Sequence, residues 1–182
     1  PDMPMDLDGK LKEPLLRLTQ LWRAYDGKSA SGRYPLVAAS VLFGQGPLQS
    51  PSVFNFFSPF YSPPGEIRNS ALVAPELQIA TEYQNTYVTN YWFFQAFALN
   101  QANPDLEADD IYIDISEEMA IAGDDDALID MVAGKLLAGE LSAALRQEIA
   151  GILALIPDAE AALRAAETVY LVVSSPEFAY QK

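Results

Sequence analysis

The sequence contains no cysteine and no histidine. The absence of cysteine excludes disulfide bonds and thiolate chemistry, but it leaves the cellular compartment open because many exported proteins also lack this residue. The absence of histidine excludes Ser-His-Asp and Cys-His catalytic groups, histidine-bound zinc or iron, and imidazole acid–base chemistry within this chain. Any catalysis would therefore depend on carboxylates, Tyr, Lys, Arg, Ser or Thr.

Positive charge is scarce. The chain has 11 Lys and Arg residues against 25 Asp and Glu residues, which gives a formal net charge of −14. Nucleic acid and anionic lipid are poor partners for such a chain, because both are bound by neutralising phosphates with Lys and Arg. Residues 69–134 contain no Lys or Arg, whereas residues 105–130 are dense in carboxylates. This acidic segment is either a solvated face or a cation site.

Long hydrophobic runs are also missing. No segment reaches the roughly 18 apolar residues that would span a bilayer, and the first ten residues lack the basic and apolar regions of a signal peptide. The sequence therefore predicts a soluble chain with no membrane span. At 182 residues and 50% hydrophobic composition, it can bury a substantial core as one domain.

The apolar residues recur mainly at the spacing of amphipathic helices. We predict an all-α fold, a helical bundle with a long ordered irregular segment, forming a single domain over residues 1–182. Residues 111–115 alternate as a short strand would, but a lone strand has nothing to pair with, so an extended connector fits equally well. The predicted helices cover residues 12–26, 75–100, 116–122, 126–139, 142–156 and 158–175, with candidate N-caps at Ser116, Asp124 or Asp125, Ser142 and Asp158.

An unusual segment rich in proline and aromatic residues lies between the first two long helices. Four prolines within residues 50–64 rule out a long helix or a central strand there. The segment is too apolar for an ordinary exposed loop, so we expect its rings to fold back and line the core. The alternative is an exposed hydrophobic groove for a partner or ligand. The apolar side chains concerned are Val53, Phe54, Phe56, Phe57, Phe60 and Tyr61.

The predicted helix over residues 75–100 has one apolar stripe. Near its end the opposite polar stripe disappears, because Trp92 and Phe93 stand between Tyr91 and Phe94. That turn must be covered by other elements or by a second molecule. The stripe predicted to be buried consists of Leu77, Ala80, Tyr83, Tyr87, Tyr91, Phe94 and Ala98.

The carboxylates give no clear catalytic or metal site. The acidic segment lacks the alternating ligands, central glycine and final glutamate of an EF-hand loop, so its aspartates are better explained as helix caps. Glu66, Glu76 and Glu82 lie close in sequence to the aromatic segment and could form a glycosidase pair, but the sequence does not give their separation. We assign no catalytic residue, no metal ligand and no cofactor.

Two adjoining stretches, SPSVFNFFSPFYSPPGEI and LVAPELQI, carry a family resemblance. The sequence there resembles the C-terminal region of a large bacterial family known as domain of unknown function 1800. Supporting stretches are KEPLLRLTQLWRAY, DDALIDMVAGKLLAGELSAALRQEI and YLVVSSPEFAYQK. The resemblance implies the C-terminal part of a longer exported protein, in the periplasm or secreted, whose helical upstream motif is absent here. The family has no established reaction, so no site residue is transferred.

The leading functional hypothesis is a non-catalytic structural or protein-interaction module. Its partner would be another protein, the remainder of the parent chain or a second copy in a homo-oligomer. The alternative is a fragment of an extracytoplasmic carboxylate-dependent hydrolase whose site is completed upstream. The predicted contact residues are Phe54, Phe56, Phe57, Phe60, Tyr61, Trp92, Phe93 and Phe94.

Overall fold

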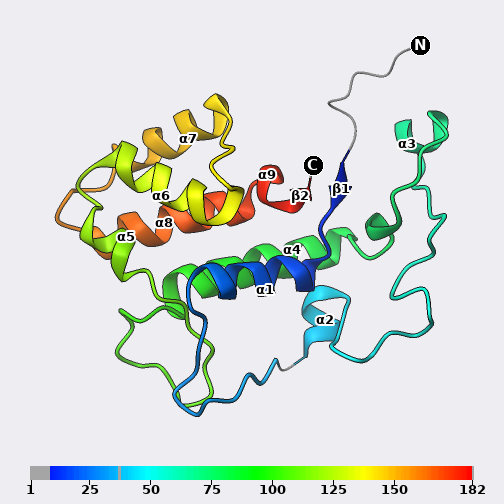
Figure 1. The fold of residues 1–182 in the computed structure, drawn as a ribbon, viewed down its shortest axis with the longest axis horizontal. Coiled ribbons are helices and arrows are strands. Elements are labelled where there is room, and N and C mark those ends of the chain that lie inside the picture. Colours follow the sequence, from blue (N-terminus) through cyan, green and yellow to red (C-terminus); the bar gives the residue numbers. More distant parts are fainter. Residues whose placement is uncertain (1–8, 37, 182) are drawn as a thin grey trace.

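The structure, a computed structural model, describes residues 9–36 and 38–181 (Figure 1). Helices dominate this part of the chain, which confirms the predicted all-α fold. The elements in chain order are β1 (Lys10–Leu11), α1 (Pro14–Ala24), α2 (Ala39–Phe43), α3 (Glu66–Asn69), the 3-10 turn η2 (Pro75–Gln78), α4 (Glu82–Phe93), the π-helical turn η3 (Phe94–Ala98), α5 (Ser116–Ala120), α6 (Asp125–Leu137), α7 (Ala143–Leu153), α8 (Ala161–Ser174), α9 (Pro176–Ala179) and β2 (Tyr180–Gln181).

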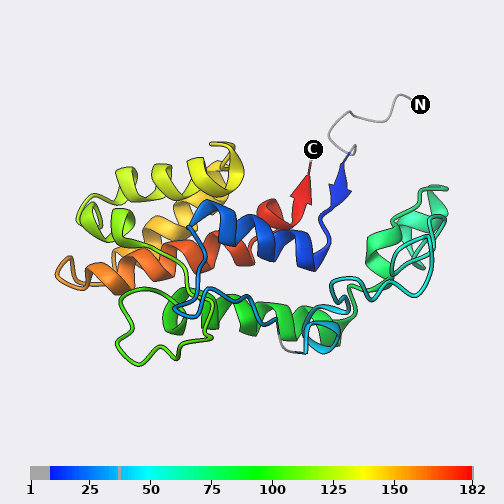
Figure 2. The same ribbon diagram turned by 60° about the horizontal axis from the view of Figure 1, so that its bottom comes forward.

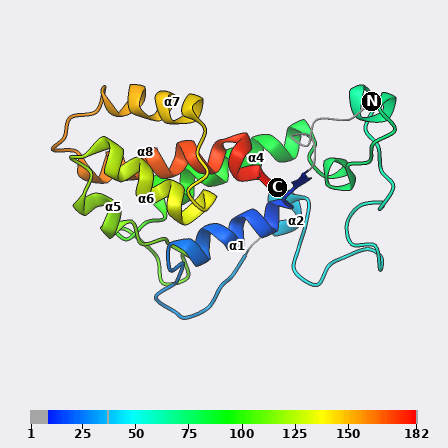
Figure 3. The ribbon, with the colours of Figure 1, turned by 45° about the horizontal axis from the view of Figure 1, so that its top comes forward.

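Helix α8 is the centre of the bundle. It contacts α4, α5, α6, α7, α9 and η3, and Figure 3 shows α6, α7 and α8 lying side by side. Its sequence explains this position, because Ala165, Val169 and Val172 bury an apolar face while Leu163 lies on the narrow exposed side. The predicted packing of the C-terminal helices as a small bundle is therefore confirmed.

Helix α1 packs against α6 and buries Leu18 and Leu21. The two ends of the described chain meet beside it, because β1 pairs with β2 in an antiparallel register. Trp92 of α4 lies between these elements, with its ring centroid 6.3 Å from that of Phe43 and 6.4 Å from that of Phe178. This aromatic contact links α2, α4 and α9.

Two of the predicted N-caps form as expected. Asp124 Oδ1 accepts a hydrogen bond from Ala127 N at 3.0 Å at the start of α6. Ser142 Oγ accepts one from Leu145 N at 3.1 Å at the start of α7. Both caps are therefore confirmed, and each satisfies a backbone donor that the first turn of a helix leaves free.

The other two predicted caps are wrong. Ser116 does not precede α5, because it is already the first residue of that helix. Asp158 lies too early to cap α8, which begins at Ala161 behind Glu160 and has no side-chain cap. Asp158 Oδ1 instead lies 3.5 Å from Nη1 of Arg164, so this carboxylate pairs with a cation inside the helix rather than with its first backbone amides.

The single helix predicted over residues 75–100 is wrong. Pro75 opens the short turn η2, and α4 begins only at Glu82. Thr81 caps this second start, since its Oγ1 accepts a hydrogen bond from Gln84 N at 3.2 Å. A local capping residue therefore divides a segment that has one continuous apolar pattern.

The buried stripe predicted for this segment is wrong as well. Tyr83 and Tyr87 are exposed, whereas Val88 and Trp92 are buried. Aromatic residues occur on both sides of α4, so its sequence alone favours neither face. The packing of α4 against α2 and α8 decides which face is inside.

Residues 111–115 form an extended connector. The backbones of Lys28 and Tyr112 exchange hydrogen bonds of 3.0 and 2.9 Å, and Ile113 N donates to the carbonyl of Leu99 at 2.9 Å. These contacts are isolated bridges, so the connector alternative of the sequence analysis is the correct one. The alternation in the sequence still predicts the buried side chains, which are Ile111, Ile113 and Ile115.

Arg164 of α8 is a buried side chain with an extensive set of bonds. It is only 2% exposed. Nε donates to the Ala122 carbonyl at 2.6 Å, and Nη1 donates to the carbonyls of Leu153 and Ile156 at 2.9 and 2.6 Å. Nη2 contacts the Asp125 carboxylate. One cation therefore satisfies carbonyl groups that follow α5 and end α7.

We expect Arg164→Met to lower the free energy of unfolding by about 3–5 kcal/mol, because it leaves buried carbonyls and a carboxylate without their partner. The matched control is Arg146→Met, which removes a more exposed arginine of α7 that pairs with Asp126 and Asp130. The control should lose less than about 1 kcal/mol. Urea unfolding measures both values, and equal losses would contradict the central role of Arg164.

Candidate interaction surface

Residues 50–78, here called the aromatic arm, leave the packed helices after α2 and return through η2. Figures 1 and 2 show the arm, with α3 near its tip, projecting beyond the end of α4. Side-chain contacts that hold it to the body lie near its ends: Asn55 Nδ2 donates to Glu13 Oε2 at 3.0 Å, and Lys10 Nζ lies 3.0 Å from Glu76 Oε1. The arm is thus attached at its base and extends into solvent.

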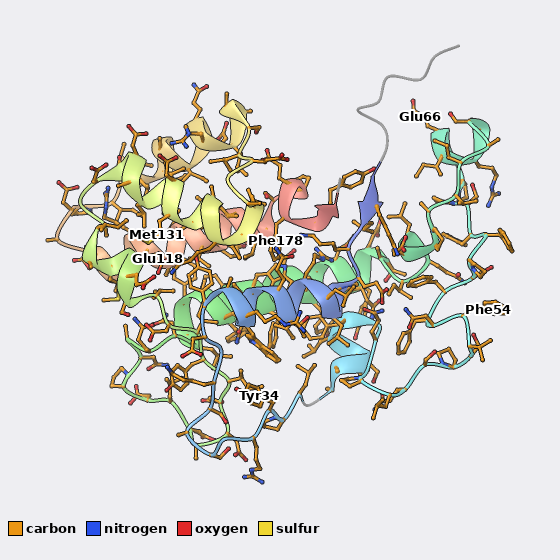
Figure 4. The ribbon with its side chains drawn as sticks, in the orientation of Figure 1. Tyr34, Phe54, Glu66, Glu118, Met131 and Phe178 are labelled. Atoms are coloured by element: carbon orange, nitrogen blue, oxygen red, sulfur yellow. The ribbon has the colours of Figure 1, made fainter. Side chains whose placement is uncertain are left out.

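The rings of the aromatic arm do not line the core, so that expectation is wrong. Phe54 is 61% exposed and Phe60 is 83% exposed, and Figure 4 places Phe54 away from the packed helices. Phe56, Phe57 and Tyr61 are half-buried. The alternative of the sequence analysis, an exposed hydrophobic groove, matches this geometry. A hollow of about 430 Å³ is lined by Phe54, Phe56, Phe57 and Phe60 together with Pro51, Pro59 and Gln78.

The turn at the end of α4 separates its aromatic residues. Trp92 is 1% exposed and takes no part in the accessible surface, whereas Phe93 and Phe94 are about half-exposed. The π-helical turn η3 follows directly, and in it Leu99 N donates to the Phe94 carbonyl five residues earlier at 2.7 Å. Such turns are frequent at functional sites. The exposed rings form a second aromatic surface beside α8.

This second surface is a packed group of rings. The centroid of Phe93 lies 4.7 Å from that of Phe97 and 5.9 Å from that of Tyr170 on α8. The centroids of Phe97 and Tyr170 are 5.8 Å apart. The rings meet mainly edge to face, which is a favourable arrangement for aromatic pairs. We call Phe93, Phe94, Phe97 and Tyr170 the aromatic patch.

The three glutamates considered for a hydrolase have different surroundings. Glu66 is exposed in α3 near the tip of the arm (Figure 4), and Glu82 is exposed at the start of α4. Glu76 is buried and paired with Lys10. The three glutamates therefore lie on different elements, and one of them is already occupied by an ion pair.

The carboxylates of the acidic segment face the few cations of the bundle. Asp109 pairs with Arg33 at 2.7 Å, and Glu117 pairs with Lys135 at 2.8 Å. Within residues 9–36 and 38–181, no three Asp or Glu side chains come close enough together to hold a metal ion. In the same part of the chain, no helix is long and apolar enough to cross a bilayer.

A buried ionic cluster was missed by the sequence analysis. Glu118 of α5, labelled in Figure 4, is fully buried, and Lys135 Nζ lies 2.7 Å from its Oε1 as an ion pair. Lys135 Nζ also lies 4.9 Å from the ring centroid of Tyr25. The sequence signal for this cluster was Glu118 itself. It stands three residues after the buried Ile115, which precedes α5, and so falls on the inner side of that helix. A charge at such a position requires a partner.

The pKa values of three groups, Tyr25, Lys135 and Tyr91, are raised in the folded chain. Burial and the neighbouring Glu118 charge raise the pKa of Tyr25 well above its ordinary value. Burial opposes protonation of Lys135, but its contacts with Glu117 and Glu118 raise its pKa overall. Burial and the Asp110 charge raise the pKa of Tyr91 to about 12. All three groups hold their protons more tightly in the folded chain.

We expect Trp92→Ala to lower the free energy of unfolding by about 3–5 kcal/mol, because it opens a cavity between three elements. Phe60→Ser should change it by less than about 0.5 kcal/mol, since the ring is mostly exposed already. Thermal and urea unfolding of the two variants measure the difference. A large loss for Phe60→Ser would show that the arm packs inward.

Alkaline pH should destabilise the folded chain. Because the folded pKa values of Tyr25, Tyr91 and Lys135 lie above the unfolded ones, their stabilisation is complete below about pH 10 and is lost as the pH rises further. Tyr25→Phe should reduce this loss, leaving the share of Tyr91 and Lys135. It should also add about 1 kcal/mol at pH 7, since the Tyr25 hydroxyl has no hydrogen-bond partner among the described residues. Urea unfolding from pH 7 to 12 measures both effects, and identical curves for the two proteins would contradict them.

Comparison with known proteins gives a family and no characterised relative. No curated protein and no solved structure matches the chain. One family model, described as "Protein of unknown function (DUF1800)", matches residues 2–180. Since this match covers nearly the whole sequence, the chain belongs to the DUF1800 family.

Proposed function

We propose that this chain is a non-catalytic interaction module of a larger exported bacterial protein. The observation that carries the proposal is the exposure of apolar side chains on the aromatic arm, where Val53, Phe54 and Phe60 face solvent. Contiguous exposed aromatic rings are typical of surfaces that bind another polypeptide. The exported location rests on the family resemblance alone.

The proposed contact surface has two parts. One is the aromatic patch, which contributes its exposed rings. The other is the aromatic arm, which contributes Phe54, Phe56, Phe57, Phe60 and Tyr61.

The charge of the chain bears on its partner. The net charge of −14 opposes the association of two identical copies. It therefore favours a different protein, or the remainder of a longer parent chain, as the partner that covers these rings.

The hydrolase alternative has less support. A carboxylate pair that cleaves a glycosidic bond needs two groups facing the same bond. Glu76 is engaged by Lys10, while Glu66 and Glu82 stand exposed on separate helices. These surroundings favour the non-catalytic proposal.

The proposal predicts measurable apolar binding. In 0.5 M salt, which screens the charge repulsion, the chain should enhance the fluorescence of an apolar dye and self-associate weakly at high concentration. Phe54→Ser combined with Phe60→Ser should reduce both signals at least twofold while leaving the unfolding temperature unchanged. Dye titration and sedimentation equilibrium measure these quantities.

The control is Leu155→Ser, which removes a similarly exposed apolar side chain just after α7, outside the arm and the patch. It should leave dye binding and association as they are. If the arm variant folds and behaves as the unchanged chain does, the contact surface is not on the arm and the proposal fails.

A further inference from the structure

Helix α1 carries a buried cation without a carboxylate partner among the described residues. Arg17 lies on the inner face of α1 beside Pro14, Leu18 and Leu21, and it is 8% exposed. Its Nε has no hydrogen-bond partner among residues 9–36 and 38–181. In that same part of the chain, no carboxylate lies within ion-pair distance of its guanidinium.

Three other cations of the bundle differ from Arg17. Lys135, Arg146 and Arg164 each contact two carboxylates. A buried charge without a partner is strongly unfavourable, so it is normally paired or replaced. The chain has 25 acidic residues, so a shortage of carboxylates does not explain the surroundings of Arg17.

Lys12 brings a second cation to the same place. Its Nζ donates to Gln20 Oε1 at 2.8 Å and lies 4.6 Å from the ring centroid of Phe178. Gln20 is held in turn, because its Nε2 donates to the Leu136 carbonyl at 2.9 Å. Arg17 and Gln20 are neighbours one turn apart on α1, so the Lys12 ammonium lies on the same side of the helix as Arg17.

The titration of the two groups agrees with this geometry. Burial lowers the pKa of Arg17 to about 10. Burial and the Arg17 charge lower the pKa of Lys12. Two cations that destabilise each other are favoured when an anion lies between them.

We propose that Arg17 and Lys12 form a binding site for an oxyanion, a carboxylate or phosphate group. The planar guanidinium offers paired donors to two oxygens of such a group, and the ammonium adds a point charge. The site lies beside β1, where Lys12 N donates to the Ala179 carbonyl at 2.8 Å. The proposed ligand is a free oxyanion from solution.

Thermal unfolding of the full chain at pH 7 tests the site, with phosphate exchanged for chloride at constant ionic strength. Phosphate at a hundred times its dissociation constant should raise the unfolding temperature by about 5 °C or more. Arg17→Met should abolish the rise. The variant should still fold, and in chloride it should unfold no earlier than the unchanged chain, because it removes a buried charge that lacks a carboxylate partner among the described residues.

Arg23→Met is the matched control, because it removes the same charge from an exposed position of α1. It should keep the rise. A rise that Arg17→Met shares is a general effect of phosphate and overturns the proposal, as does a rise that Arg23→Met loses equally. The absence of a phosphate rise in the unchanged chain also overturns the site.

Discussion

The guanidinium of Arg164 is the interaction on which the packing around α8 depends. It donates to carbonyls that follow α5 and end α7, and it contacts the first residue of α6. Helix ends leave carbonyl groups without partners, and their burial is tolerated only when another donor reaches them. Arg164 therefore lets three helix ends meet near the start of α8, where apolar side chains alone could not satisfy their polar groups.

The same sharing of cations recurs elsewhere in the bundle. Lys135 and Arg146 each contact two carboxylates from the acidic segment, so few cations serve many anions. Arg17 of α1 and Lys12, which precedes this helix, are the contrast, because neither has such a contact among the described residues. In a strongly acidic chain, that contrast supports the proposed oxyanion site at Arg17 and Lys12.

The aromatic residues fall into two groups, one buried in the packed helices and one exposed on the arm. Trp92 and Phe43 join elements of the core, while Phe54 and Phe60 project on an arm attached at its base. The difference does not lie in residue type. It follows from where the backbone carries each ring, through the packed helix α4 in one case and the extended arm in the other.

The sequence by itself determined the helical class, the cap at Ser142, a cap at Asp124 or Asp125, and the irregular course of the proline-rich segment, because these depend on local periodicity and backbone chemistry. The tertiary structure decided which rings are buried. It also divided residues 75–100 at Thr81 and gave Glu118 and Arg164 their partners. A two-sided aromatic helix or a charge on an apolar face is ambiguous in sequence, since its burial depends on contacts with residues far away in the chain.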